Sequence, residues 1–107
     1  MPRKSLIYRT SSNREPFNEF VERLDDRRAK AKIFARIGRA QKDNLGDYKG
    51  VGEGVLELRI HFGPGYRIYI GLYADDWIIL LCAGDKQSQA KDIERAHMHW
   101  EDYKNHA

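Results

Sequence analysis

The sequence has a single cysteine, so no disulfide can form within the chain. Cys82 lies in the apolar run WIILLCA, where we expect a buried, unreactive thiol. The chain has four histidines, but they lack the spacing of zinc ligands and have no cysteine pair beside them. The sequence therefore predicts neither a metal site nor a cofactor.

Long apolar runs are also missing. No segment approaches the roughly 20 residues of a membrane span, and the opening MPRKSLIYRT has no apolar core of a signal peptide. We therefore expect a cytoplasmic protein without membrane contact. Only three prolines occur, and 41% apolar with 33% charged residues is typical of a compact globule. We expect a single domain over residues 1–107.

Positive charge is unevenly distributed along the chain. Residues 1–49 contain 13 Lys and Arg against 7 Asp and Glu, a net charge of +6. Residues 50–107 contain 6 against 9, a net charge of −3. The basic front half favours a polyanion or an acidic partner segment, although charges along a helix are more often simply solvated.

Hydrophobic periodicity predicts the order β-α-α-β-β-β-α and thus an α+β fold. The segment KSLIYRT has the composition of a short strand, and residues 16–24 and 27–42 have helical spacing. Asp25 and Asp26 are the expected caps of the second helix. Residues 55–62, 66–73 and 77–82 resemble strands joined by GPG and ADD as antiparallel hairpins, and residues 88–103 form a last helix. GVGEGV at residues 50–55 precedes a strand and lacks a following Gly-Lys-Ser/Thr, so we expect a turn and not a phosphate loop.

The hairpin ELRIHFGPGYRIYI, residues 57–70, gathers polar residues on one face. Because side chains alternate between the two faces of a strand, the apolar residues of this hairpin should face the core. We expect the following residues to be buried together: Leu58, Ile60, Ile68, Ile70, Ile79 and Leu81 with Phe20, Ile33 and Ile37. The opposite face carries Glu57, Arg59, His61, Arg67 and Tyr69. The strand at residues 77–82 is apolar at both odd and even positions, which suits an inner strand covered on both sides. We therefore expect the polar face of the hairpin to be a concave strip.

These residue types suit a phosphate-bearing partner. Arginine offers two parallel donors to phosphate, tyrosine a ring for base stacking, and histidine exchanges protons near neutral pH. Cleavage of RNA through its 2′-hydroxyl needs charge stabilisation and a proton acceptor. The candidate catalytic residues are therefore Arg59, His61, Arg67 and Lys86, the last in GDK at the strand exit. The candidate RNA-binding residues are Tyr69 and, on the second helix, Arg28, Lys32 and Arg36.

A purely structural interpretation of the same residues is equally open. Arg59 and Arg67 could simply pair with Glu57 and with acids of the helices, and a lone surface histidine such as His61 needs no function. If the arginines bind phosphate, Arg67→Ala should abolish function with little loss of stability, because we expect the arginine in an exposed ion pair.

The segments GVGEGVLELRIHFGPGYRIYI and LLCAGDKQSQAKDIERA resemble the addiction-module killer proteins, a HigB-like and phage Gp49-like branch of the RelE/ParE toxin superfamily. The resemblance extends from the basic helix RRAKAKIFARI through the last helix. It implies a helical hairpin packed on a small antiparallel sheet. It also implies a type II toxin neutralised by a cognate antitoxin, for which we expect the helix-turn-helix type.

The resemblance also implies roles for individual residues. The arginine of the Gly-Tyr-Arg turn in ribonucleolytic relatives falls on Arg67, that of the preceding strand on Arg59, and the cation after the strand-exit glycine on Lys86. Two lysines of the RelE-type nucleases fall on Val55 and Glu57. Their last-segment tyrosine falls near Asp92, so His61 is the only nearby titratable substitute.

The sequence thus predicts an endoribonuclease that cleaves messenger RNA on the ribosome. Two alternatives stay open. One is a non-enzymatic, ParE-like inhibitor of DNA gyrase or another replication protein, and the other is a toxin-like module that acts only as a repressor partner.

Overall fold

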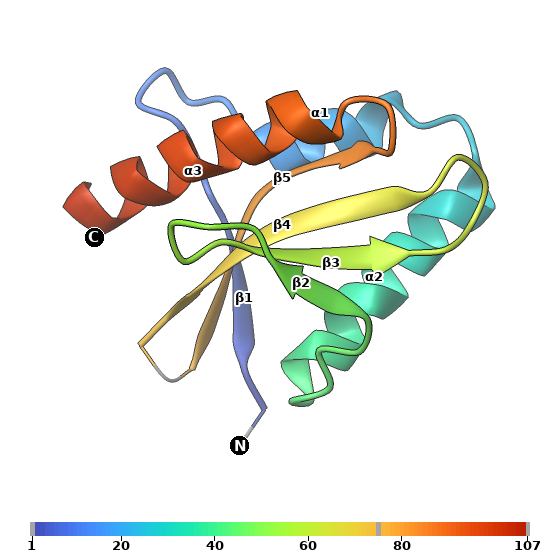
Figure 1. The fold of residues 1–107 in the computed structure, drawn as a ribbon, viewed down its shortest axis with the longest axis horizontal. Helices are drawn as coiled ribbons and strands as arrows, with labels where there is room; N and C mark the ends of the chain where they lie inside the picture. The colour runs from blue at the N-terminus through green and yellow to red at the C-terminus, as the bar shows by residue number, and fades with distance from the viewer. Residues whose placement is uncertain (1, 75, 107) are drawn as a thin grey trace.

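The computed structural model describes residues 2–74 and 76–106 of the chain (Figure 1). Its elements are β1 (Lys4–Ile7), α1 (Pro16–Arg23), α2 (Arg27–Gln41), β2 (Tyr48–Gly50), β3 (Leu56–Ile60), β4 (Tyr66–Tyr73), β5 (Trp77–Asp85) and α3 (Gln89–His106). The predicted α+β class and element order are confirmed, and the short strand β2 is an addition. None of the helices in the described ranges has the length and apolar character needed to cross a membrane.

The sheet has the strand order β1-β5-β4-β3-β2. Strands β3, β4 and β5 pair antiparallel, as predicted from their short connections, and β2 also pairs antiparallel with β3. β1 instead pairs parallel with β5. A parallel pair needs a long connection, and here everything from α1 to β4 lies between the two strands. The turn at residues 51–55 joins β2 to β3 and is closed by a hydrogen bond from Val51 N to Val55 O at 3.0 Å, so the predicted turn is confirmed.

The two front helices begin where the sequence predicts. Pro16 occupies the first turn of α1, where its missing N–H costs nothing. Asp26 caps α2, and its Oδ1 accepts hydrogen bonds from the backbone N of Arg28 at 2.8 Å and of Ala29 at 3.2 Å. The apolar stripe of α2 is buried and consists of Ala29, Ile33, Ile37 and Ala40, of which Ile33 and Ile37 were expected.

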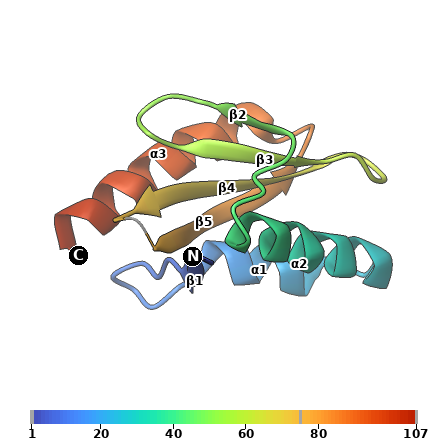
Figure 2. The same cartoon turned by 90° about the horizontal axis from the view of Figure 1, so that it is seen from below.

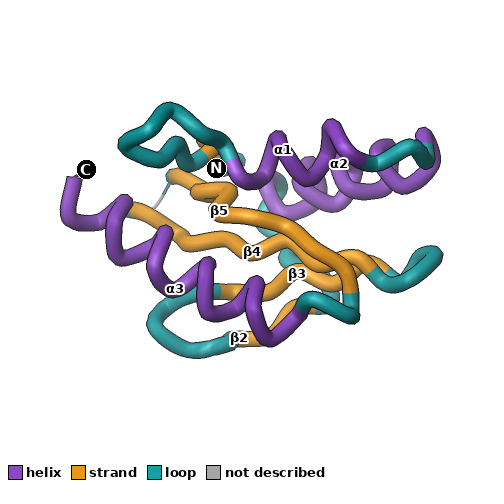
Figure 3. Tube along the Cα trace, turned by 90° about the horizontal axis from the view of Figure 1, so that it is seen from above, coloured by secondary structure: helices purple, strands orange, loops and turns teal. Residues whose placement is uncertain are grey.

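Helices cover both faces of the sheet, with α1 and α2 on one side and α3 on the other (Figure 2 and Figure 3). This arrangement creates two cores. The first core, under α1 and α2, contains the expected buried residues Leu58, Ile60, Ile68, Ile70, Ile33 and Ile37, with Phe20 partly buried beside them. Ile79 and Leu81 are buried too, but they belong to the second core under α3. The expectation of one shared core is therefore wrong, because β5 is covered on both faces.

Two strand glycines let α3 lie directly on the sheet. A Cβ at Gly71 would come within 2.5 Å of the Trp100 ring, and one at Gly84 within 1.8 Å of Oδ2 of Asp92. Trp100 is buried in the core under α3. The close packing of α3 covers much of the face that we expected to be a concave strip. The end of that face near the β3–β4 turn stays open.

Candidate nucleic-acid interface

A hollow of about 410 Å³ opens where β3 turns into β4 and where β5 leads into α3. The four residues predicted to be catalytic, Arg59, His61, Arg67 and Lys86, all line this hollow. The hairpin brings the first three together, and Lys86 arrives from the end of β5. We call this space the hairpin hollow.

A buried carboxylate holds the two arginines of the hairpin hollow. Arg59 and Arg67 are opposite each other in the β3–β4 ladder, where like charges repel. Glu57, which is fully buried, supplies a negative charge to both arginines. Its Oε1 accepts a hydrogen bond from Nε of Arg59 at 3.0 Å. Its Oε2 lies 3.6 Å from Nε of Arg67. The interpretation of both arginines as partners of Glu57 is therefore correct.

Glu57 has two further donors. The Tyr69 hydroxyl donates to Oε2 at 3.1 Å, and Nε2 of Gln89 donates to the same oxygen at 3.0 Å. Burial by itself would raise the pKa of Glu57, but the hydrogen bonds from Gln89, Arg59 and Tyr69 and the charge of Arg67 hold that pKa below its ordinary value. Glu57 is thus an ionised anchor at neutral pH.

Tyr69 cannot serve as a stacking platform. Its ring is fully buried in the core under α3, and its hydroxyl is bonded to Glu57. Burial and the neighbouring carboxylate raise the pKa of this hydroxyl far above its ordinary value. The predicted RNA contact of Tyr69 is therefore wrong, because strand alternation places the ring on the face that α3 covers.

Arg67 is more buried than the sequence led us to expect. Only 13% of its side chain is exposed, so the expected exposed ion pair is wrong. Its Nε and Nη1 are buried and have no hydrogen-bond partner among the described residues. A buried donor without a partner costs about 1–3 kcal/mol, and this cost falls mainly on Nη1, because Nε still lies 3.6 Å from the charged Oε2 of Glu57. An arginine with an unpaired donor is chemically suited to an anionic oxygen.

A second hollow of about 280 Å³ adjoins the first and shares Arg59 and His61 with it. Lys32 of α2 lines this second hollow, and its Nζ lies 5.1 Å from the centre of the Phe62 ring. We call the continuous surface made by Lys86, Arg67, Arg59, His61 and Lys32 the cationic strip. Its length along two hollows suits a chain of phosphates better than a single anion.

The other two α2 candidates are placed differently. Arg28 is exposed but lines neither hollow. Arg36 is buried, and its guanidinium donates to the backbone oxygens of Arg59 at 3.1 Å, of Asp47 at 2.8 Å and of Leu45. The predicted RNA contact of Arg36 is wrong, because the side chain points inward and ties the α2–β2 connection to β3.

His61 has a partner that the sequence did not indicate. Its Nε2 lies 2.5 Å from Oδ2 of Asp47, and 77% of the His61 side chain is exposed. The hydrogen bond with His61 lowers the pKa of Asp47. Asp47 and Gln89 were both missed by sequence reasoning. Asp47 lies in the segment DNLGD, residues 43–47, which follows α2, and Gln89 is 32 residues from Glu57. Only the tertiary fold therefore brings each to its partner.

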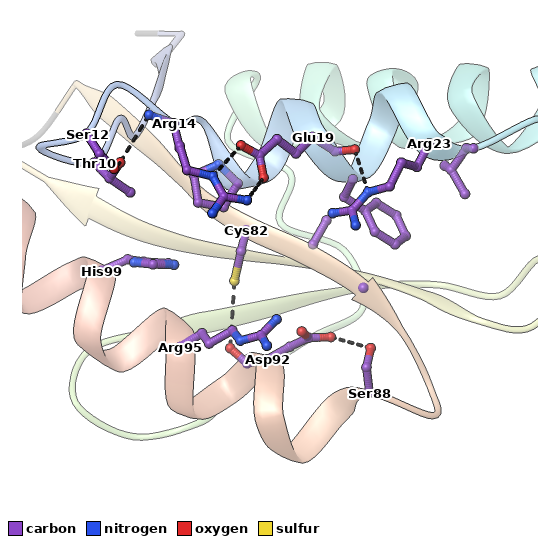
Figure 4. Close-up of a pocket in the computed structure, with 15 residues that line it drawn as sticks. Thr10, Ser12, Arg14, Glu19, Arg23, Cys82, Ser88, Asp92, Arg95 and His99 are labelled. Carbon is purple, nitrogen blue, oxygen red and sulfur yellow. Dashed lines mark hydrogen bonds and ion pairs between the residues drawn. The ribbon is translucent and has the colours of Figure 1, made fainter.

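A larger concavity lies elsewhere. A cleft of about 860 Å³ separates α1 from α3 above β5, and its side chains are drawn in Figure 4. Arg14 pairs with Glu19 at 2.8 Å, and the Ser88 hydroxyl donates to Oδ2 of Asp92 at 2.5 Å. On the floor, burial and then the Asp92 charge raise the pKa of Cys82 to about 12, which confirms the expected buried thiol. None of the predicted site residues lies in this α1–α3 cleft.

Comparison with known proteins gives the family of the chain. The sequence model of the phage-derived Gp49-like proteins matches residues 19–100. The chain belongs to this Gp49-like family. The match runs from α1 into α3 and includes every residue of the cationic strip. An uncharacterized protein of Haemophilus influenzae is 50% identical over 80 residues, which cover 75% of this chain and 81% of that relative.

Proposed function

We propose that this Gp49-like protein is the toxin of a type II toxin–antitoxin module and that it cleaves messenger RNA held in the ribosome. The family is associated with addiction-module toxins, which supports the toxin role. The observation that carries the nuclease role is the hairpin hollow, where Arg59, Arg67 and Lys86 converge and two buried nitrogens of Arg67 have no hydrogen-bond partner among the described residues.

The chemistry of the strip suits attack by a 2′-hydroxyl on the adjacent phosphorus. The 2′-oxygen forms a bond to phosphorus and loses its proton, while the 5′-oxygen leaves and takes up a proton, which gives a 2′,3′-cyclic phosphate and a 5′-hydroxyl. Arg67 and Arg59 stabilise the extra negative charge on the phosphoryl oxygens, and Lys86 adds a third cation. His61 accepts the 2′-hydroxyl proton. The ribosome would contribute the alignment of the two oxygens, which this open surface lacks.

The test is cleavage of a defined messenger RNA on purified ribosomes. We expect cleavage by the wild-type protein and a strong loss with Lys86→Ala, because one phosphate-directed cation is removed. Lys91→Ala is the matched control, since Lys91 is also exposed near the start of α3 but lines neither hollow. A DNA gyrase supercoiling assay is run in parallel. Loss of supercoiling without RNA cleavage would replace the nuclease role by the gyrase-inhibitor role.

The proposed partner is a cognate antitoxin of the helix-turn-helix type with an acidic, apolar-anchored segment. The net charge of +6 over residues 1–49 supports this chemistry, because opposite charges speed the encounter of two proteins. We expect the association rate with the product of the neighbouring gene to fall as salt is raised, as measured by stopped-flow mixing. A rate independent of salt would show that charge does not steer the encounter.

A further inference from the structure

Asp47, which faces His61, lies in the α2–β2 connection, and two hydrogen bonds hold its backbone in place. The backbone oxygen of Asp47 accepts one hydrogen bond from the backbone N of Arg59 at 3.0 Å and another from Nη2 of Arg36 at 2.8 Å. Arg36 is buried, so this second donor is itself fixed by its surroundings. The α2–β2 connection is therefore clamped to β3 at the point where its acid meets the hollows.

The preceding residue makes this placement possible. Gly46 has a φ of +61°, in the left-handed region that disfavours a side chain. A Cβ there would also lie 2.9 Å from Nη2 of Arg39. The chain can thus turn sharply at Gly46 and present the Asp47 carboxylate to Nε2 of His61 at 2.5 Å.

We propose that Asp47 is a positioning residue that holds His61 as the proton acceptor of the cationic strip. The inference rests on the proposed RNA cleavage, in which His61 contacts the substrate and Asp47 acts only through His61. An ionised carboxylate accepts a hydrogen bond, so the ring donates from Nε2 and the neutral imidazole keeps its lone pair on Nδ1. Nδ1 then takes the proton of the 2′-hydroxyl while Asp47 stabilises the imidazolium that forms.

The neighbouring charged groups, Arg36 and Arg59 beside the pair and Glu57 behind Arg59, limit the alternatives. Arg36 is engaged with backbone oxygens, and Arg59 donates its Nε to Glu57. Glu57 is buried and holds four partners, so it is not free to take a proton from a substrate. Among the described residues that line the two hollows, His61 is the one histidine, and Asp47 is the one carboxylate.

The experiment is a double-mutant cycle on ribosome-dependent RNA cleavage. We expect His61→Gln to lower kcat about 100-fold, the usual scale for loss of a general base. Asp47→Ala should lower kcat about 10-fold with KM unchanged, because binding of RNA does not need the acid. Asp47→Asn keeps an accepting oxygen without the charge, so its kcat should lie between that of Asp47→Ala and that of the wild type. In the His61→Gln background, Asp47→Ala should have no further effect, whereas a merely structural role would lower kcat again.

A matched control exists at the other end of the molecule. His106 Nδ1 lies 3.2 Å from Oδ1 of Asp102, and 76% of the His106 side chain is exposed. This His–Asp pair lines neither hollow, so His106→Gln should cleave RNA at the wild-type rate.

A second measurement does not depend on catalysis. The ¹⁵N chemical shifts of the His61 ring should report the Nε2–H tautomer in the wild type and a mixture of tautomers in Asp47→Ala. Unchanged shifts, or additive losses of kcat in the cycle, would overturn the positioning role while leaving the nuclease role intact. Absence of RNA cleavage by the wild type would instead overturn the proposed function, and with it the catalytic meaning of the pair.

Discussion

The hairpin hollow and the α1–α3 cleft differ in volume and in how completely their charged groups are paired. The cleft is the larger, about 860 Å³ against about 410 Å³. Yet part of its charge is internally paired, as Arg14 and Glu19 show (Figure 4). The hairpin hollow has a largely buried arginine, Arg67, with two nitrogens that make no hydrogen bond within the described part of the chain. Donor nitrogens without hydrogen-bond partners, more than volume, identify the better candidate for an anion site.

The two regions also contain two buried carboxyl groups with opposite properties. Burial by itself would raise the pKa of both Glu57 and Asp92. At Glu57 three hydrogen bonds and the Arg67 charge outweigh burial and lower the pKa below its ordinary value. At Asp92 the bond from Ser88 and the charge of Arg95 do not, and the pKa stays raised. The number of donors around a buried acid therefore decides whether it anchors cations.

The largest effect should come from removing the charge of Glu57, and the same change at Asp92 should have little effect. Glu57→Gln should lower the free energy of unfolding by about 3 kcal/mol or more, because two close guanidinium groups lose their buried counter-charge. Asp92→Asn should cost less than about 1 kcal/mol, since the raised pKa shows that the charge contributes little there. Urea denaturation at pH 7 measures both. Equal losses would remove the distinction between the two carboxyls.

Arginine variants should separate the two concavities by activity. Arg67→Ala should lower RNA cleavage about 100-fold or more, as loss of charge stabilisation does in other enzymes. Arg67→Lys should restore only part of the rate, because lysine keeps the charge but not the planar fork. Arg14→Ala in the α1–α3 cleft should cleave RNA like the wild type. Cleavage on purified ribosomes gives the comparison.

The same variants must be checked for folding. Arg67 is largely buried, so we now expect Arg67→Ala to lower the free energy of unfolding by about 1–3 kcal/mol, in contrast to the small loss predicted from the sequence. Circular-dichroism melting shows whether the variant is folded at the assay temperature. A folded Arg67→Ala variant with full cleavage would reassign the arginine to the structure alone.

The pH dependence of stability should have opposite signs in the two regions. Glu57 has a lowered folded pKa, so its contribution is present above its ordinary value of 4.5 and is lost as the pH falls through the folded pKa. Asp92 has a raised folded pKa, so its contribution is present below its ordinary value of 3.8 and is lost as the pH rises through the folded pKa. Relative to the wild type, Glu57→Gln should therefore lose stability with rising pH, and Asp92→Asn should gain it.

Urea denaturation from pH 3 to pH 6 follows both differences in the same buffers. Slopes of the same sign for the two variants would mean that one of the carboxyls has been assigned the wrong ionisation behaviour.

The smallest effect should be seen in thiol chemistry. Cys82 on the floor of the cleft is buried and has its pKa raised to about 12, so iodoacetamide at pH 8 should leave it unmodified in the folded protein. A thiol introduced by Lys86→Cys at the exposed rim of the hairpin hollow should react readily. Mass spectrometry counts the added groups. Modification of Cys82 at the same rate would show that the cleft opens on the timescale of the reaction.

Sequence patterns predicted much of the fold because they report local preferences. Alternation in β3 and β4 assigned Leu58 and Ile68 to the core, and the two-sided apolar run of β5 indicated cover on both faces. The same alternation could not show how far α3 extends over the polar face, which depends on close approaches at Gly71 and Gly84. Tyr69 was misjudged for that reason.

The sequence by itself determined the residue types of the cationic strip, since the hairpin spacing alone brings Arg59, His61 and Arg67 to one end of the sheet. Only the tertiary structure decided what each can do. Glu57 meets Gln89 across 32 residues, and Asp47 reaches His61 through a connection clamped by a buried arginine. Burial and hydrogen bonding set the charge, the orientation and the accessibility of a side chain, and these depend on neighbours that are distant along the chain.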